Sequence, residues 1–150
     1  MIHQLAYRSR SGLDTSHSAD EIRSILVVSR RNNAAANVTG FLLCDEAGFF
    51  QILEGAEGDV TTAFRRIEKD PRHRDIEVIQ TWNRPARTFP EWSMGGASRN
   101  GDHAPIFVRH GIEAERSLAD LPFPAAMALA MDLQDALRAA RSGGGVGSTD

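Results

Sequence analysis

The sequence predicts an α+β domain of the ferredoxin-like type, with elements in the order β-α-β-β-α-β-β followed by C-terminal helices. Three observations support this class. The chain has 150 residues, 41% hydrophobic and 25% charged, which suits one compact folded domain. Short apolar runs of strand length alternate with two stretches of helical periodicity. Two helices that each bury one apolar stripe fit the same face of a mixed sheet, so we expect the C-terminal helices to pack on the other face.

The first strand and the first helix are predicted near the N-terminus. Residues 2–9 alternate loosely between polar and apolar side chains, which indicates a strand, and a turn-rich stretch follows. Ser18 and Glu21 form an S-x-x-E capping box ahead of apolar residues at helical spacing. We therefore expect an amphipathic helix that ends near Asn33.

A β-hairpin and a second helix come next. Residues 38–44 and 49–54 are short apolar runs separated by the turn sequence D-E-A-G, a pattern typical of paired antiparallel strands. Asp59 is a favourable N-cap for a helix whose apolar residues recur at i, i+3, i+4 and i+7. Asp70 and Pro71 end this helix, because the residue before a proline disfavours the helical conformation.

The rest of the chain predicts two more strands and a helical cap. Residues 76–82 form a fourth strand and residues 92–97 a fifth. A short helix is expected around 106–117, and a longer helix over about 125–141 carries a wide apolar stripe rich in methionine. The glycine-rich end predicts a flexible tail. We expect three units, namely a domain over 1–98, a helical cap over 99–141 and a tail over 142–150.

Composition and motifs exclude several function classes. With 17 basic and 20 acidic residues the net charge is -3, so no basic field favours nucleic acid or an anionic membrane surface. Cys44 is the only cysteine, which excludes an intrachain disulfide, and we expect it to be a buried spectator. The five histidines form no H-E-x-x-H motif, so we predict no metal site. No apolar run approaches the roughly 18 residues of a membrane span, and we expect a cytoplasmic protein.

Several polar residues stand where apolar ones are expected. Gln51 lies in the middle of a predicted central strand, where a buried amide without partners costs about 1–3 kcal/mol, so it needs a partner. Alternatively, it bonds the neighbouring backbone or points to solvent. Asn32 and Asn33 in the last turn of the first helix are also simply common helix-end residues. Arg66 and Asp70 are four residues apart, so they could form an ordinary ion pair on a solvated helix face.

Taken together, five motifs in a fixed order resemble the BLUF domain, a flavin-binding blue-light sensor. The match covers about residues 1–98. The motifs are Tyr7-x-Ser9, N-A-A-A-N-V-T-G from Asn33 to Gly40, F-x-Q-x-L-E-G around Gln51, D-P-R-H from Asp70 to His73, and R-x-F-x-x-W-S-M from Arg87 to Met94.

This resemblance implies FAD held noncovalently between the two predicted helices. The ring is a flat apolar slab with one hydrogen-bonding edge, so its pocket needs apolar walls and a few amides. By position in the family pattern, Asn33 bonds the carbonyl and imide edge, and Asn32 is a neighbouring cofactor contact. Arg66 and Asp70 correspond to contacts with the ribityl and phosphate part. The implied cofactor-binding residues are Tyr7, Ile25, Asn32, Asn33, Gln51, Arg66 and Asp70.

The mechanism implied by the resemblance is photochemical. Tyr7 gives the excited flavin an electron and a proton through Gln51, which is left rotated or tautomerised, and no substrate is turned over. Trp92 and Met94 match positions whose packing alternates near Gln51, although plain core packing is the alternative. Trp82 is an additional indole that could compete as an electron donor if it lies near the ring.

The residues after the sensor are too few for a cyclase, phosphodiesterase or DNA-binding output domain. We therefore expect a non-enzymatic photoreceptor that signals to another protein through its C-terminal helices, as a homodimer or higher oligomer. The alternative is a flavin-dependent oxidoreductase of ferredoxin-like fold, which would need a substrate cavity beside the flavin. An acylphosphatase-like enzyme is disfavoured because the sequence lacks a glycine-rich phosphate loop with a partnering arginine.

Overall fold

The computed structural model describes residues 1–11, 18–45, 48–91, 95–98, 103–111 and 118–143. Its elements follow the predicted order, with an added 3-10 turn. They are β1 (Ile2–Ser11), α1 (Ser18–Ala35), β2 (Thr39–Cys44), β3 (Gly48–Gly55), α2 (Glu57–Glu68), β4 (His73–Arg84), β5 (Gly95–Ser98), α3 (Ala104–Arg109), the 3-10 turn η1 (Leu118–Asp120) and α4 (Phe123–Gly143).

The sheet has five strands in the order β4-β1-β3-β2-β5. All neighbours are antiparallel except β2 and β5, which are parallel. The two crossovers through α1 and α2 therefore place β1 and β3 at the centre, which confirms the ferredoxin-like α+β class. Every residue of β3 is buried, as expected for the strand that carries Gln51.

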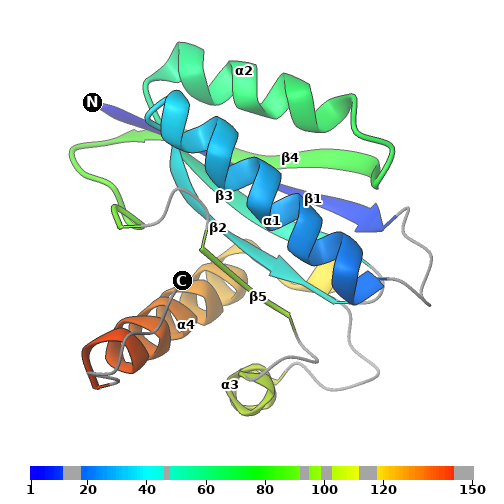
Figure 1. Cartoon of the computed structure of the whole chain (residues 1–150), viewed down its shortest axis with the longest axis vertical. Helices are drawn as coiled ribbons and strands as arrows, with labels where there is room; N and C mark the ends of the chain where they lie inside the picture. Colours follow the sequence, from blue (N-terminus) through cyan, green and yellow to red (C-terminus); the bar gives the residue numbers. More distant parts are fainter. Residues whose placement is uncertain (12–17, 46–47, 92–94, 99–102, 112–117, 144–150) are drawn as a thin grey trace.

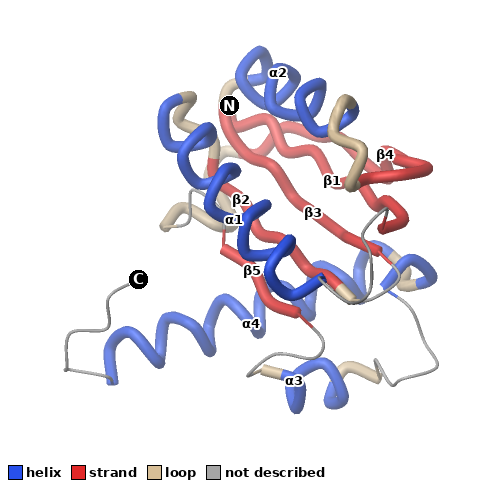
Figure 2. Tube along the Cα trace, turned by 45° about the vertical axis from the view of Figure 1, so that its right-hand side comes forward, coloured by secondary structure: helices blue, strands red, loops and turns tan. Residues whose placement is uncertain are grey.

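Helices cover both faces of the sheet. Figures 1 and 2 show α1 and α2 on one face and α4 on the other, as the sequence predicted. Successive strand residues alternate between the two faces, so Tyr7 packs toward α1 and α2 whereas Ala6 packs toward α4. Cys44 is buried in the first of these two cores, in agreement with the prediction.

Several element boundaries differ from the prediction. The prediction of Asp59 as the N-cap was wrong, because the N-cap of α2 is Ala56, three residues earlier, and it makes no side-chain capping bond. Asp59 lies instead in the first turn, where its charge interacts favourably with the helix dipole. The short C-terminal helix ends earlier than expected, since α3 stops at Arg109 and Gly111 adopts a left-handed φ of 79°.

β4 is longer than predicted and carries two irregularities in its pairing with β1. One of them lies between Ala6 and Tyr7, which pair with Gln80 and Val78. The intervening residue is a bulge, and a bulge reverses which face the following side chains meet. Ile76 therefore packs toward α1 and α2, whereas Trp82, six residues later, packs toward α4.

Candidate functional site

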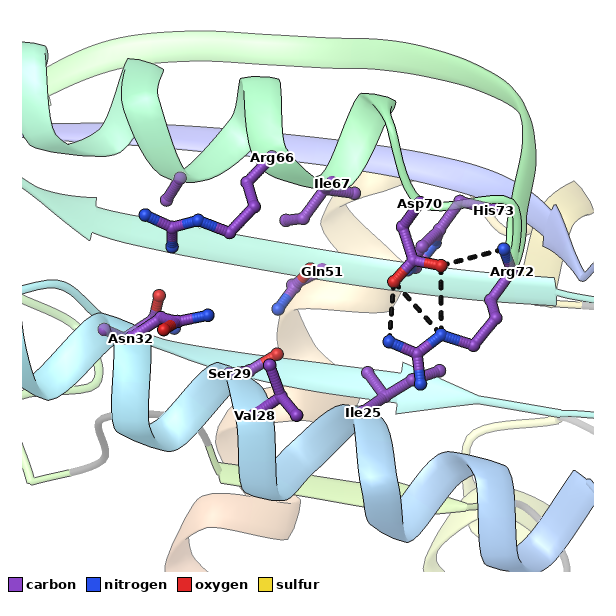
Figure 3. A pocket seen from close by; sticks show the side chains of 12 residues that line it. Ile25, Val28, Ser29, Asn32, Gln51, Arg66, Ile67, Asp70, Arg72 and His73 are labelled. Carbon is purple, nitrogen blue, oxygen red and sulfur yellow. Dashed lines mark hydrogen bonds and ion pairs between the residues drawn. The ribbon is translucent and has the colours of Figure 1, made fainter.

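A cleft lies between α1 and α2, above the middle of β3. Counted together with the open solvent at its mouth, the empty space of this cleft is about 530 Å³. Figure 3 shows Gln51 at its floor, with side chains of α1 on one side and of α2 on the other. The lining residues are Ile25, Val28, Ser29, Asn32, Asn33, Gln51, Ala63, Arg66, Ile67, Asp70, Arg72 and His73.

The floor of the cleft holds a hydrogen-bonded tyrosine and glutamine. The β1–β3 register places Tyr7 directly opposite Gln51, and the Tyr7 hydroxyl donates to Oε1 of Gln51. Gln51 thus has a side-chain partner, as its position in the central strand predicted. Tyr7 is fully buried, and its ring lies 5.4 Å from that of Phe64. Burial raises the pKa of the Tyr7 phenol, and the nearby Asp70 carboxylate raises it further, so the phenol keeps its proton.

α1 supplies one wall of the cleft through residues that share a helical face. Ile25, Ser29, Asn32 and Asn33 recur at i, i+4, i+7 and i+8, so their side chains line the same stripe. α1 continues to Ala35, which places the two asparagines within its last turn and beside the cleft. The helix thereby presents apolar surface at one end of the cleft and amide groups at the other.

α2 and the turn after it supply the opposite wall. Figure 3 draws the Arg66 guanidinium on the side of Asn32, away from Asp70. The Asp70 carboxylate instead accepts a fork from Arg72, with Nε to Oδ1 at 3.0 Å and Nη2 to Oδ2 at 2.6 Å. These bonds hold the pKa of Asp70 below its usual value. The alternative i, i+4 pair of Arg66 with Asp70 is therefore replaced by an Asp70–Arg72 pair, and Arg66 lines the cleft.

His73 is a cleft residue that the sequence analysis did not single out beyond its motif. Its Nδ1 lies 2.9 Å from the Ser9 hydroxyl, and its ring centroid lies 4.6 Å from that of Phe49. The Tyr7 ring meets it edge-on at 6.0 Å. Burial lowers the pKa of His73 to about 4, so the imidazole is neutral near pH 7. The sequence feature that could have indicated His73 was its partner Ser9, which lies two residues after Tyr7 and hence on the same strand face.

The cleft therefore unites most of the predicted site. It is lined by six of the seven predicted cofactor contacts, and Tyr7 joins them through Gln51. Trp92 and Met94 lie outside the described residues. Trp82 lies on the opposite face of the sheet, with its ring 5.2 Å from that of Phe123, so it does not face the cleft.

The described part of the chain contains no cluster of His, Cys, Asp and Glu suited to a metal ion. Within the same residues, no helix has the length and apolar character needed to cross a membrane. The chemistry available in the cleft is that of amides, the Arg66 guanidinium, the paired Asp70 carboxylate and Arg72 guanidinium, one neutral imidazole and a buried phenol. Such a set can hold a flat heteroaromatic ring by its polar edge and a phosphate by the arginine.

Comparison with known sequences gives one family and several relatives. Residues 2–95 match the BLUF family, described as sensors of blue-light using FAD. The blue light- and temperature-regulated antirepressor BluF of Escherichia coli is 36% identical over 94 residues, 63% of this chain and 23% of that protein. Photoactivated adenylate cyclase subunit alpha of Euglena gracilis is 31% identical over 62% of this chain and 9% of its own length. The chain thus spans less than a quarter of the length of these relatives.

Solved structures match over most of the chain. The dark state of BlrB, a BLUF protein, superposes with a TM-score of 0.73 and 31% identity, covering 90% of this chain and 96% of that one. The photo-activated state of BlsA gives a TM-score of 0.74 at 27% identity, with coverages of 89% and 95%. A bacterial light-regulated adenylyl cyclase matches with a TM-score of 0.65 and 34% identity over 73% of this chain and 32% of that one.

Proposed function

This chain belongs to the BLUF family of blue-light sensors, and from that premise we propose that it is a photoreceptor that holds FAD noncovalently between α1 and α2. The observation that carries the proposal is the buried hydrogen bond from the Tyr7 hydroxyl to Gln51 Oε1 at the floor of that cleft. This bond joins the Tyr7 phenol to an amide that lines the cleft, and in this proposal the flavin ring lies on the other side of that amide. Proton transfer needs groups within hydrogen-bond reach, and the bonded pair supplies them.

The residues of the cleft fit a flavin. The donors and acceptors of Asn32, Asn33 and Gln51 suit the imide edge of the ring, and Ile25 offers an apolar wall. Arg66 suits a phosphate, since a guanidinium binds phosphate oxygens in bidentate fashion. Asp70 would accept bonds from ribityl hydroxyls, in competition with Arg72.

When bound, the flavin supplies absorption of blue light and a strong excited-state oxidant. Tyr7 would give an electron to that oxidant, and its hydroxyl proton would move along the existing hydrogen bond to Gln51 Oε1. When the electron and the proton return to Tyr7, Gln51 settles in a rotated or tautomerised form. Its amide then presents a different donor and acceptor to the cleft, which is the lit signal. Trp92 and Met94 are the proposed residues that respond to this change.

We further propose that this chain is a sensor without catalytic turnover and that its signal passes to a partner protein. In this proposal residues 1–98 form the sensor, 99–141 form the output cap and 142–150 are a flexible tail. The printed names of relatives include an antirepressor and adenylate cyclases, so BLUF sensors act on different outputs. We also propose a homodimer or higher oligomer, an expectation that rests on the methionine-rich helix over 125–141, in which Met131 is exposed. Light scattering that gives a monomer in both dark and light would contradict that expectation.

The proposal is tested by absorption spectroscopy of the purified protein before and after blue light, with the released cofactor identified by chromatography. We expect a yellow protein that releases FAD and shows a reversible red shift. One solved relative contains FMN, so identifying the released flavin distinguishes an FAD-binding protein from an FMN-binding one. A colourless preparation after FAD is added would contradict the proposal. Bleaching by NADPH without a red shift would favour the flavin oxidoreductase instead.

Gln51 has a specific test within the same experiment. The Gln51→Ala variant removes the proton acceptor but leaves the other cleft residues in place. We expect it to retain flavin and to lose the red shift. As a matched control, Ser29→Ala changes another polar residue of the cleft and should keep the shift. A full red shift in Gln51→Ala would overturn the role proposed for this residue.

A further inference from the structure

A buried carboxylate fastens residues 85–91, the described part of the segment between β4 and β5, to the central strand. Glu54, near the end of β3, is fully buried. Its carboxylate oxygens accept hydrogen bonds from the backbone N–H of Thr88 at 2.7 Å and of Phe89 at 2.6 Å. The Gln4 side chain donates a third bond of 2.7 Å. Because charge-assisted bonds to a buried anion are strong, these contacts fix the segment around Thr88 relative to the sheet.

The same segment is bonded to α4 on the other side. The side-chain Nε2 of Gln134 donates to the backbone carbonyl oxygen of Thr88 at 3.1 Å, and the Thr88 hydroxyl accepts from Gln4 at 3.2 Å. Gln134 is only 3% exposed and stands beside the buried Leu133 on the otherwise apolar inner face of α4. A buried amide there costs free energy that an apolar side chain would not, so packing alone does not explain its presence.

This junction has unused hydrogen-bonding capacity. The side-chain oxygens of Gln4 and Gln134 are both buried, and neither receives a hydrogen bond from a residue that the structure describes. Both amides belong to the same network through Thr88. Each amide oxygen can therefore accept a further hydrogen bond when the groups around Thr88 rearrange.

This hydrogen-bond network begins at Glu54, three residues after Gln51 on β3. Gln51 and Glu54 lie on the same strand, and alternation turns Gln51 toward the cleft and Glu54 toward the α4 face. A displacement of β3 at Gln51 therefore moves the carboxylate that holds the segment around Thr88. From Thr88 the shortest described connection to the output cap is the bond to Gln134.

We propose that Gln134 is a positioning residue for light signalling, which couples α4 to the segment between β4 and β5 through the Thr88 carbonyl. The inference rests on the proposed photoreceptor function and adds the point at which the signal enters the cap. In the dark the bond holds α4 against the sheet. In the light the segment moves, the bond is lost or rearranged, and the packing of α4 loosens.

Hydrogen exchange of the flavin-loaded full chain, in dark and in continuous blue light, tests this coupling. We expect α4 amides of the unchanged chain to exchange at least about threefold faster in the light. Gln134→Leu keeps the apolar packing and removes the donor, and it should retain the red shift while the lit-to-dark exchange ratio of α4 falls to near one. Gln134→Met is a second variant of similar volume in case the branched side chain fits poorly.

A matched control removes a second polar contact between this segment and α4. Arg138 lies 3.1 Å from Glu91 in an exposed ion pair, so Arg138→Gln should leave both the red shift and the exchange ratio unchanged. A normal red shift with an unaltered exchange ratio in both Gln134 variants would overturn the coupling alone. A flavin-loaded chain without any red shift would overturn the proposed photoreceptor function instead.

Discussion

Acidification should destabilise this protein through His73, and the loss should begin at a pH well above that at which carboxylates titrate. The imidazole is buried beneath the cleft against Phe49 and bonded to Ser9. Burial lowers its pKa from 6.5 to about 4. In the unfolded chain the ordinary pKa returns, so between these two values the unfolded state binds a proton that the folded state does not. Stability therefore falls as the pH decreases from about 6.5 to about 4.

The size of the effect follows from the two pKa values. Proton linkage to a group with pKa 6.5 unfolded and about 4 folded gives a loss of about 2 kcal/mol between pH 7 and pH 5. The loss reaches about 3 kcal/mol at pH 4 and levels off below that. Asp70 also stabilises the folded state, but this stabilisation is lost over a lower pH range. Folding lowers the pKa of Asp70, so the stabilisation is lost only as the pH falls below the ordinary carboxyl pKa.

Urea denaturation at pH 7, 6 and 5 measures this difference, with His73→Phe as the matched variant at equal flavin content. Phenylalanine preserves a ring against Phe49 and cannot titrate, so its constant cost from the lost Ser9 bond does not depend on pH. We expect the wild-type chain to lose about 2 kcal/mol more than the variant from pH 7 to pH 5. Equal losses in the two proteins would refute the assignment of a neutral, buried His73.

Three further predictions concern the scaffold. Gly48→Ala should destabilise the fold by about 1–3 kcal/mol in urea denaturation, because a Cβ there would lie 2.4 Å from the Ser9 carbonyl oxygen, whereas Gly58→Ala meets nothing within 4 Å and should stabilise by up to about 1 kcal/mol. If both substitutions changed the free energy of unfolding in the same direction, this steric argument would be contradicted. Glu54→Gln should cost about 2–3 kcal/mol by the same measurement, since it places an amide where three donors converge, and a cost below about 0.5 kcal/mol would refute the anchoring role. Leu133→Ala should cost about 2–5 kcal/mol from the cavity it leaves under α4, and an unchanged urea midpoint would show that α4 does not pack there.

The sequence was most informative where periodicity and burial act along a single element. Alternating and helical spacings predicted the element order and the face assignments, because each strand or helix must bury its own apolar side. The need of Gln51 for a partner was likewise a local inference, since any amide in a central strand must be satisfied. Its hydrogen bond with Tyr7 meets that need.

Features that depend on distant contacts could not be predicted in this way. The side of the sheet on which Trp82 packs depends on a bulge in the pairing of β4 with β1. No residue type in the strand indicates that bulge. Burial of His73 depends on Ser9 and Phe49, which are far away in the sequence. The role of Glu54 depends on backbone N–H groups of a loop, and such donors are present at nearly every position of any chain.

The start of α2 shows a different limit. Asp59 is a better N-cap residue than Ala56 by intrinsic preference, yet the helix begins at Glu57. Val60 and Ala63 are buried, so the register of the helix is set by packing against the sheet. Capping preferences of about 1 kcal/mol are smaller than the free energy gained from burying such an apolar face.

The light-minus-dark absorption spectrum of Tyr7→Phe tests the central claim most directly. Tyr7 is the only tyrosine in the chain, so this substitution removes every phenol and leaves the cleft apolar at that point. The account predicts a variant that binds FAD as the wild type does and shows no red shift under blue light. A reversible red shift of wild-type size in this variant would contradict the claim that the Tyr7–Gln51 pair generates the signal.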